Sequence, residues 1–290
     1  MAPDIVGPPC NFWLLDPNSG YDLTRPTPNS PPIKKRITLE TINTTPITID
    51  PAKTALIIID MQNYFLSPAL GRKQVACHRA EEALLTHGIP AARKAGVQIV
   101  HVTWGLSEGE MDEIPPVLWR AFGYTYEEGV GPEKRRDRGI GEDMGEVTLE
   151  DGSSVAAGKM LMRGSWNAEI HGRLKRGFDE SQTTGLVDVK VNKNRISGFW
   201  GGKTEAIVFL EEKGIKTLLF TGVNTDQCVY SSLVDACNMG FDTVLLRDGC
   251  GTTSPEFARE MVEFNCTRTF GFLSTCEALA KGVDAMLNTR

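Results

Sequence analysis

The stretch IKTLLFTGVNTDQCVYSSLVDACNMGFDTVLLRD, residues 215–248, decides the fold of the chain. Its first and last segments, 215–222 and 241–248, are short and almost continuously apolar, as expected for strands that are buried on both faces. Between them, apolar residues recur at helical spacing from Val229 onward, and Gly240 ends the helix. A strand, a helix and a strand with short connections predict two parallel strands in one sheet.

The same alternation of strand-like and helical segments runs through most of the chain. The remaining segments are strands at 54–60, 97–104 and 187–191 and helices at about 79–94 and 204–214. Two more helices are expected after Ser254-Pro255, where proline takes the first helical position, and after the capping box from Ser274 to Glu277. We therefore predict an α/β protein with a doubly wound, mostly parallel sheet and helices on both faces.

Composition narrows the function classes. The 290 residues are 41% apolar and 23% charged, which is ordinary for a globular protein, and the net charge of −6 gives no reason to expect nucleic acid or an anionic membrane as partner. No apolar run approaches the roughly 20 residues that span a bilayer, and no secretory signal is recognisable. Seven cysteines without a C-x-x-C pair favour reduced thiols and a cytoplasmic location.

Two segments depart from the regular pattern. Residues 1–50 hold nine of the sixteen prolines and are interpreted as a proline-rich, extended N-terminal arm. Residues 106–186 are polar and rich in glycine, and we interpret them as an insertion over one end of the sheet that shapes the binding site. Within the insertion, EVTLEDGSSV predicts a hairpin around Asp151-Gly152.

Reactive side chains gather where ligands bind in an open parallel sheet, beyond the carboxyl ends of the strands. Asp60 closes the first strand, Lys193 follows the third with Lys190 as a competitor, and Cys228 lies at a helix start after the fourth. A helix N-terminus and a nearby lysine favour a thiolate, and a carboxylate can accept and return its proton. The alternative is structural, because buried cysteine is common and an aspartate at a strand end often caps a helix.

The residues around these three positions are more specific than their placement. Asp60 lies in LIIIDMQNYFLSP, Lys193 opens KNRISGF, and Cys228 lies in FTGVNTDQCVYSSLVDACNMGFDTVLLRDGC. In this order, the three blocks resemble the isochorismatase-like cysteine hydrolase family over roughly residues 50–280. The resemblance implies an isochorismatase-like hydrolase domain at 51–290 with a doubly wound parallel sheet and an Asp–Lys–Cys catalytic triad.

By this resemblance, Asp60 is the acid/base, Lys193 is the triad lysine, and Cys228 is the nucleophile. The resemblance also implies a cis peptide bond at Val223–Asn224 and an oxyanion hole formed by the backbone N–H groups of Asn224 and Cys228. Such a site would cleave a C–N bond of a small molecule, in an amide, carbamate or ureido group, through a thioester intermediate.

Two alternatives remain open. One is an isochorismatase that cleaves the vinyl ether of isochorismate to pyruvate and a dihydroxybenzoate precursor, for which relatives can work without the cysteine. The other is a catalytically degenerate binding scaffold, against which the joint presence of Asp60, Lys193 and Cys228 argues.

A metal is not expected. Relatives that cleave nicotinamide or pyrazinamide carry an Asp-x-His-x-x-His motif after the second strand, where this chain reads HVTWGLSEGEMDE with only His101. No two of the four histidines have ligand spacing, so we predict neither metal nor cofactor and interpret His101 as a satisfied core or rim residue.

The residues that would line the substrate pocket follow the strand ends and lie in the insertion. The candidates are Gln62, Asn63, Phe65, Trp104, Trp166, Asn167, Phe199 and Trp200. Each has an alternative role in packing or in starting a helix. As partners we expect a small-molecule substrate and no nucleic acid or membrane. A homo-oligomer is also expected, because arms rich in proline often wrap a neighbouring subunit.

Overall fold

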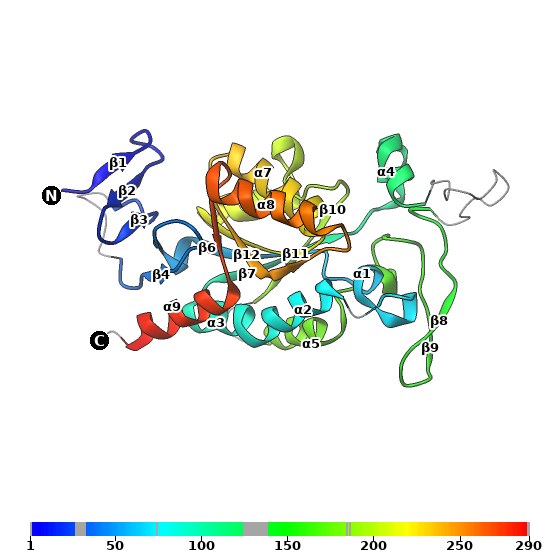
Figure 1. Ribbon diagram of the computed structural model, residues 1–290. Helices are drawn as coiled ribbons and strands as arrows, with labels where there is room; N and C mark the ends of the chain where they lie inside the picture. The colour runs from blue at the N-terminus through cyan, green and yellow to red at the C-terminus, as the bar shows by residue number, and fades with distance from the viewer. Residues whose placement is uncertain are drawn as a thin grey trace.

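The computed structural model describes residues 2–26, 33–73, 75–123, 139–183, 185 and 187–288. Its centre is a six-stranded sheet in the order β10-β7-β6-β11-β12-β13, in which every pairing is parallel (Figure 1). The strands are β6 (Thr54–Ile59), β7 (Gln98–Trp104), β10 (Val189–Lys193), β11 (Thr217–Val223), β12 (Asp242–Gly251) and β13 (Phe272–Ser274). All of the strands expected from apolar runs are present, within a few residues of the predicted ends.

Helices cover both faces of the sheet, as predicted (Figure 1). One face carries α6 (Glu205–Glu212), α7 (Tyr230–Asn238) and α8 (Glu256–Arg268), and the other carries α2 (Ala76–Ala83), α3 (Ile89–Ala95), α5 (Gly172–Ser181) and α9 (Cys276–Asn288). The apolar side chains of each face form a separate core. β6 is buried in all six residues because both of its faces are covered, which explains its unbroken apolar sequence.

The sheet is doubly wound around β6. The chain first builds outward through β7 and β10 and then crosses back to add β11, β12 and β13 on the other side of β6. β6 and β11 are therefore neighbours whose following loops diverge, which makes their carboxyl ends the switch point where α/β sheets bind ligands.

Local signals account for several helix ends. α3 stops at Gly96, which takes the left-handed conformation with φ of 80°. The predicted capping box at the start of α9 is wrong in detail, since Ser274 is the last residue of β13. Instead, the Thr275 hydroxyl accepts the backbone N–H of Ala278, and the Asp248 carboxylate accepts that of Cys276.

The N-terminal segment differs from the extended arm expected of it. It forms a second, five-stranded sheet in the order β1-β2-β3-β5-β4, made of β1 (Asp4–Val6), β2 (Trp13–Asp16), β3 (Gly20–Asp22), β4 (Ile37–Leu39) and β5 (Ile47–Ile49). This sheet is tied to the start of β12, where Asp242 accepts hydrogen bonds from Trp13 Nε1 at 2.7 Å and from Arg25 at 2.5 and 2.8 Å.

The insertion contains α4 (Pro116–Ala121) and the predicted hairpin, formed by β8 (Glu146–Thr148) and β9 (Ser154–Ala156). It also includes α5, so part of it belongs to the regular layering of the fold. Residues 124–138, 184 and 186 of the predicted insertion lie outside the described residues. Within the described ranges, no helix is both long and apolar enough to cross a membrane.

Candidate active site

Three titratable side chains meet at the switch point of the sheet. Asp60 follows β6 directly, Cys228 lies in the π-helical turn Thr225–Val229 that follows β11, and Lys193 is the last residue of β10. The side chains of Asp60 and Lys193 are fully buried, and Cys228 is 5% exposed. The structure therefore brings together the three residues that the sequence placed at strand ends.

The lysine lies between the other two groups. Lys193 Nζ is 3.0 Å from Asp60 Oδ2 and 3.4 Å from Cys228 Sγ, and it also donates to two backbone carbonyl oxygens. The competitor Lys190 instead lies 3.6 Å from the Glu169 carboxylate and contacts neither Asp60 nor Cys228 through a hydrogen bond or ion pair in the described structure. The geometry thus favours Lys193 over Lys190.

A tryptophan and a glutamine hold this arrangement. Lys193 Nζ lies 3.8 Å from the centre of the Trp104 ring, and the backbone N–H of Trp104 donates to Asp60 Oδ1 at 3.2 Å. Gln62 accepts from the same N–H and donates to the carbonyl oxygens of Trp104 and Ala168 at 2.8 and 2.7 Å. A buried ammonium is stabilised both by the carboxylate and by the indole face.

The electrostatics of the thiol differ from expectation. Burial, opposed by Lys193 and reinforced by the nearby Asp60 carboxylate, raises the pKa of Cys228 to about 12. Burial likewise raises the pKa of Asp60, against the opposing effect of Lys193. Desolvation thus outweighs the lysine, and the shift favours the neutral thiol, opposite in direction to the easier ionisation expected from the sequence. A raised pKa makes Asp60 a stronger base for that proton.

The turn that carries Cys228 is fixed by close backbone contacts. The Val223–Asn224 peptide bond is cis, as the resemblance implied. Gly222 has φ of 111°, and a Cβ there would lie 2.0 Å from the carbonyl oxygen of Ile59 on β6. Ser232 donates to the Cys228 carbonyl oxygen at 2.7 Å and accepts from the backbone of the segment that follows Lys193. The nucleophile candidate is thus positioned by the neighbouring strand β6 and by the segment that follows β10.

Several residues predicted to line the pocket are structural. Gln62 and Asn167 are fully buried with their amides bonded to backbone; Asn167 holds the insertion through Leu161, Ala157 and Lys159. Phe199 packs against Phe220 in the core, with ring centres 5.7 Å apart. For these three residues the structure shows packing and hydrogen bonding within the chain, and their predicted role in lining the substrate pocket stays a prediction.

The remaining residues predicted to line the pocket do not lie together. Trp104 is fully buried under Lys193, and Phe65 is half-buried against Tyr64 with ring centres 4.9 Å apart. Trp200 is 39% exposed and stacks with the Arg195 guanidinium 4.6 Å from its ring centre. Asn63 and Trp166 are joined by a hydrogen bond of 2.8 Å.

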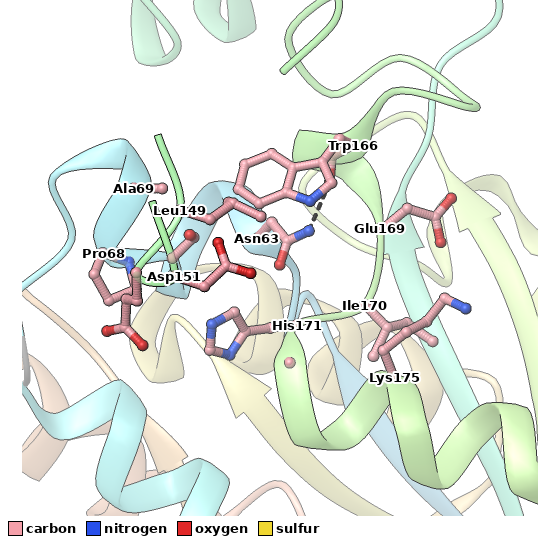
Figure 2. Close-up of a pocket in the computed structure, with 13 residues that line it drawn as sticks. Asn63, Pro68, Ala69, Leu149, Asp151, Trp166, Glu169, Ile170, His171 and Lys175 are labelled. Atoms are coloured by element: carbon pink, nitrogen blue, oxygen red, sulfur yellow. Dashed lines mark hydrogen bonds between the residues drawn. The ribbon is translucent and has the colours of Figure 1, made fainter. Parts of the chain in front are cut away.

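Asn63 and Trp166 face a cavity of about 520 Å³ beside the hairpin, which also includes Asp151 and His171 (Figure 2). Asp60, Lys193 and Cys228 are not among its lining residues. This cavity is therefore separate from the triad, and these two residues do not contact the candidate nucleophile through it.

A neighbouring aromatic group was missed from the sequence. Phe122, at the end of α4, lies edge-on to Trp104 with ring centres 5.0 Å apart and 6.3 Å from the ring of Tyr64. Its only sequence signal was its place in the insertion, which did not distinguish it from other aromatic residues. Among the described residues, no three His, Cys, Asp or Glu side chains are arranged to hold a metal ion.

Comparisons with known proteins agree with this architecture. The ureidoacrylate amidohydrolase RutB of Caulobacter vibrioides is 28% identical over 235 residues, covering 79% of this chain and 91% of that protein. A cysteine hydrolase from Pseudomonas syringae pv. phaseolicola matches the fold with a TM-score of 0.58 at 17% identity, over 89% of this chain and 99% of its own. The nicotinamidase PncA of Bacillus subtilis matches with a TM-score of 0.52 at 22% identity, over 77% and 99%.

The family model of the isochorismatase domain matches residues 54–275, which include every strand of the central sheet. RutB is named an amidohydrolase, which is a class of hydrolase. The chain is therefore a hydrolase that belongs to the isochorismatase family.

Proposed function

We propose that this protein is a cysteine amidohydrolase that cleaves a C–N bond of a small acyl amide or ureido compound. The observation that carries the proposal is the buried contact of Lys193 with both Asp60 and Cys228. A vinyl ether could be cleaved by a carboxylic acid alone, whereas a sulfur atom beside a base serves acyl transfer.

The chemistry begins with a neutral thiol. As the substrate carbonyl carbon approaches, Asp60 accepts the proton of Cys228 and the sulfur forms a bond to that carbon. The carbonyl oxygen becomes an oxyanion, which the backbone N–H groups of Asn224 and Cys228 would stabilise. Lys193 keeps a positive charge beside the thiolate that forms in this step, so the proton transfer does not leave an uncompensated buried charge.

The second half of the reaction releases the products. The C–N bond breaks, and Asp60 returns its proton to the departing nitrogen, which leaves a thioester on Cys228 and a carboxylate at position 60. Water, deprotonated by Asp60, attacks the thioester, and the carboxylic acid leaves as the thiol regains its proton. Atoms and charge balance without metal or cofactor, and the substrate must carry a carbonyl carbon bonded to nitrogen.

Ureido acids are the first substrate class to test, because RutB of Caulobacter vibrioides, at 28% identity, is named for ureidoacrylate. A release assay would offer ureidoacrylate, simple carboxamides and isochorismate separately to the wild type, Cys228→Ser and Cys228→Ala. We expect an amine or ammonia from a C–N substrate and at least a 10³-fold loss of turnover in both variants. Pyruvate from isochorismate with turnover retained in Cys228→Ala would overturn the proposal.

A further inference from the structure

A second cavity is lined by none of the triad residues. It lies on the face of the sheet that α3 and α5 cover, and Figure 1 shows the place of these two helices. Its volume is about 280 Å³, which suits a ligand of about ten heavy atoms or fewer. Its walls come from Leu85 in the π-helical turn Leu84–Gly88 before α3, from α3, β7 and α5, and from the residue before β10. Neither the proposed reaction nor the cavity of Figure 2 uses these residues.

His101 lies at the sheet side of this cavity. Its side chain is 2% exposed, and its neighbours Val100 and Val102 belong to the core of the opposite face. The ring packs edge-on against Phe178 with centres 5.5 Å apart. His101 was predicted to be a satisfied core or rim residue; it is a core residue, but within the described residues its Nε2 has no hydrogen-bond partner. A buried ring nitrogen without a partner is rare in native proteins and indicates a missing one.

The imidazole is a hydrogen-bonding group and not a charge. Burial first, and then Arg93 and Lys190, lower the pKa of His101 to about 3. The ring is therefore neutral at physiological pH, with one N–H donor and one acceptor nitrogen. A ligand group that reaches Nε2 must complement one of these.

The cavity is lined by charged side chains of both signs. Arg93, Arg173 and Arg176 line it together with Asp188 and Glu180. Arg93 pairs with Asp188 at 2.8 Å, and Arg173 pairs with a carboxylate on α2 at 2.6 Å. No ion pair engages Arg176 in the part of the chain that the structure describes. The same holds for the Glu180 carboxylate, four residues further along α5. Arg176 is therefore the guanidinium of the lining that can bind a carboxylate without giving up an ion pair that the structure describes.

The rest of the wall is apolar and comes from both helices and the turn. Apart from Gly177, it consists of Leu85, Ile89, Pro90, Leu174 and Phe178. A ligand here would bury carbon against these side chains and place its polar end toward Arg176 and His101. A fully hydrated ion such as phosphate would leave this apolar wall without a partner.

We propose that this cavity is a second binding site, for a small monocarboxylate with an apolar body, whose carboxylate contacts Arg176 and hydrogen-bonds to His101. The site is independent of the acyl chemistry. His101 and Trp104 are three residues apart on β7, which places the site about 10 Å along the strand from the aromatic ring that supports Lys193.

Benzoate is a suitable probe, and benzamide is its neutral counterpart. Calorimetric titration of the full chain, repeated with Cys228→Ser to separate binding from turnover, would measure both. We expect saturable benzoate binding that weakens at least tenfold in Arg176→Gln and in His101→Leu. Binding should be unchanged in Arg268→Gln, an exposed arginine on the opposite face. Benzamide should bind at least tenfold more weakly than benzoate.

Each contrary result has a meaning. If the cavity holds only water, benzoate gives no saturable heat, and the proposal fails. Binding that survives both Arg176→Gln and His101→Leu places benzoate elsewhere and also overturns it. Inorganic phosphate binding as tightly as benzoate would contradict the apolar body. If His101→Leu does not fold, Arg176→Gln, which changes an exposed side chain, decides the question alone.

Discussion

Lys193 and Trp104 are register partners in the parallel pairing of β10 with β7, and the ammonium of the lysine lies 3.8 Å from the centre of the indole ring. On its other side the ammonium is 3.0 Å from the Asp60 carboxylate. The register of two strands thus fixes a buried cation between an aromatic face and an anion, next to the sulfur that it is proposed to assist.

Substitution of the two lysines of β10 should affect kcat/KM very differently. Lys193→Met removes the charge that compensates Asp60, so we expect at least a 10²-fold fall in kcat/KM. Lys190→Met is the matched control, because that lysine pairs with Glu169 at a part-exposed position, and its kcat/KM should change less than threefold. Steady-state kinetics on one confirmed substrate checks this. The reverse order of effects would mean that Lys190 is the functional lysine.

Gln62 should matter for stability. Gln62→Leu leaves the buried carbonyl oxygens of Trp104 and Ala168 without their donor, which costs about 1–3 kcal/mol for each group. Urea denaturation should therefore show a clear loss in the free energy of unfolding. Gln227→Leu changes an exposed glutamine and should stay within about 0.5 kcal/mol of the wild type. Equal stability of the two variants would argue against a stabilising role for the Gln62 hydrogen bonds.

The order in which the cysteine thiols are alkylated should follow their solvent exposure. Because Cys228 has a pKa of about 12 and is 5% exposed, iodoacetamide at neutral pH should label the exposed Cys10 first. Because pH 7 to 9 lies far below the pKa of Cys228, the thiolate fraction is small and rises about tenfold per pH unit. The labelling rate of Cys228 should rise by the same factor. Peptide mass spectrometry at several pH values measures this. A plateau below pH 8 would mean that the resting thiol is ionised.

The N-terminal sheet should be stabilised through Asp242. Arg25→Met leaves a buried carboxylate with Trp13 and Thr217 as remaining donors, and we expect a cost of up to about 3–5 kcal/mol. The double variant Arg25→Met/Asp242→Asn should recover part of the loss, since no unpaired charge remains. Additive effects in this double-mutant cycle, measured by chemical denaturation, would show that the pair is not coupled.

Much of the fold could be predicted because its strands are buried on both faces. Unbroken apolar runs such as Thr54–Ile59 are best interpreted as strands that are buried on both faces. In a parallel sheet the carboxyl ends of such strands all lie on the same side. Asp60, Lys193 and Cys228 could therefore be placed together without knowing any contact.

Other features depended on information that local sequence does not carry. Lys190 and Lys193 are an odd number of residues apart, so they point to opposite faces, but the short run before them does not reveal which face is which. Phe199 could not be assigned to the core before its partner Phe220 was known to lie beside it. The strands of the N-terminal sheet are only three or four residues long, too short for a reliable pattern.

The attachment of the N-terminal sheet to Asp242, the first residue of β12, has a practical side. All strands of the central sheet run in the same direction, and the triad lies at their carboxyl ends. A fluorophore or a resin linkage installed near Ile5, which is 70% exposed, would lie toward the amino ends of these strands. Immobilised protein prepared in this way should keep its turnover, which makes that end the natural handle for a flow reactor.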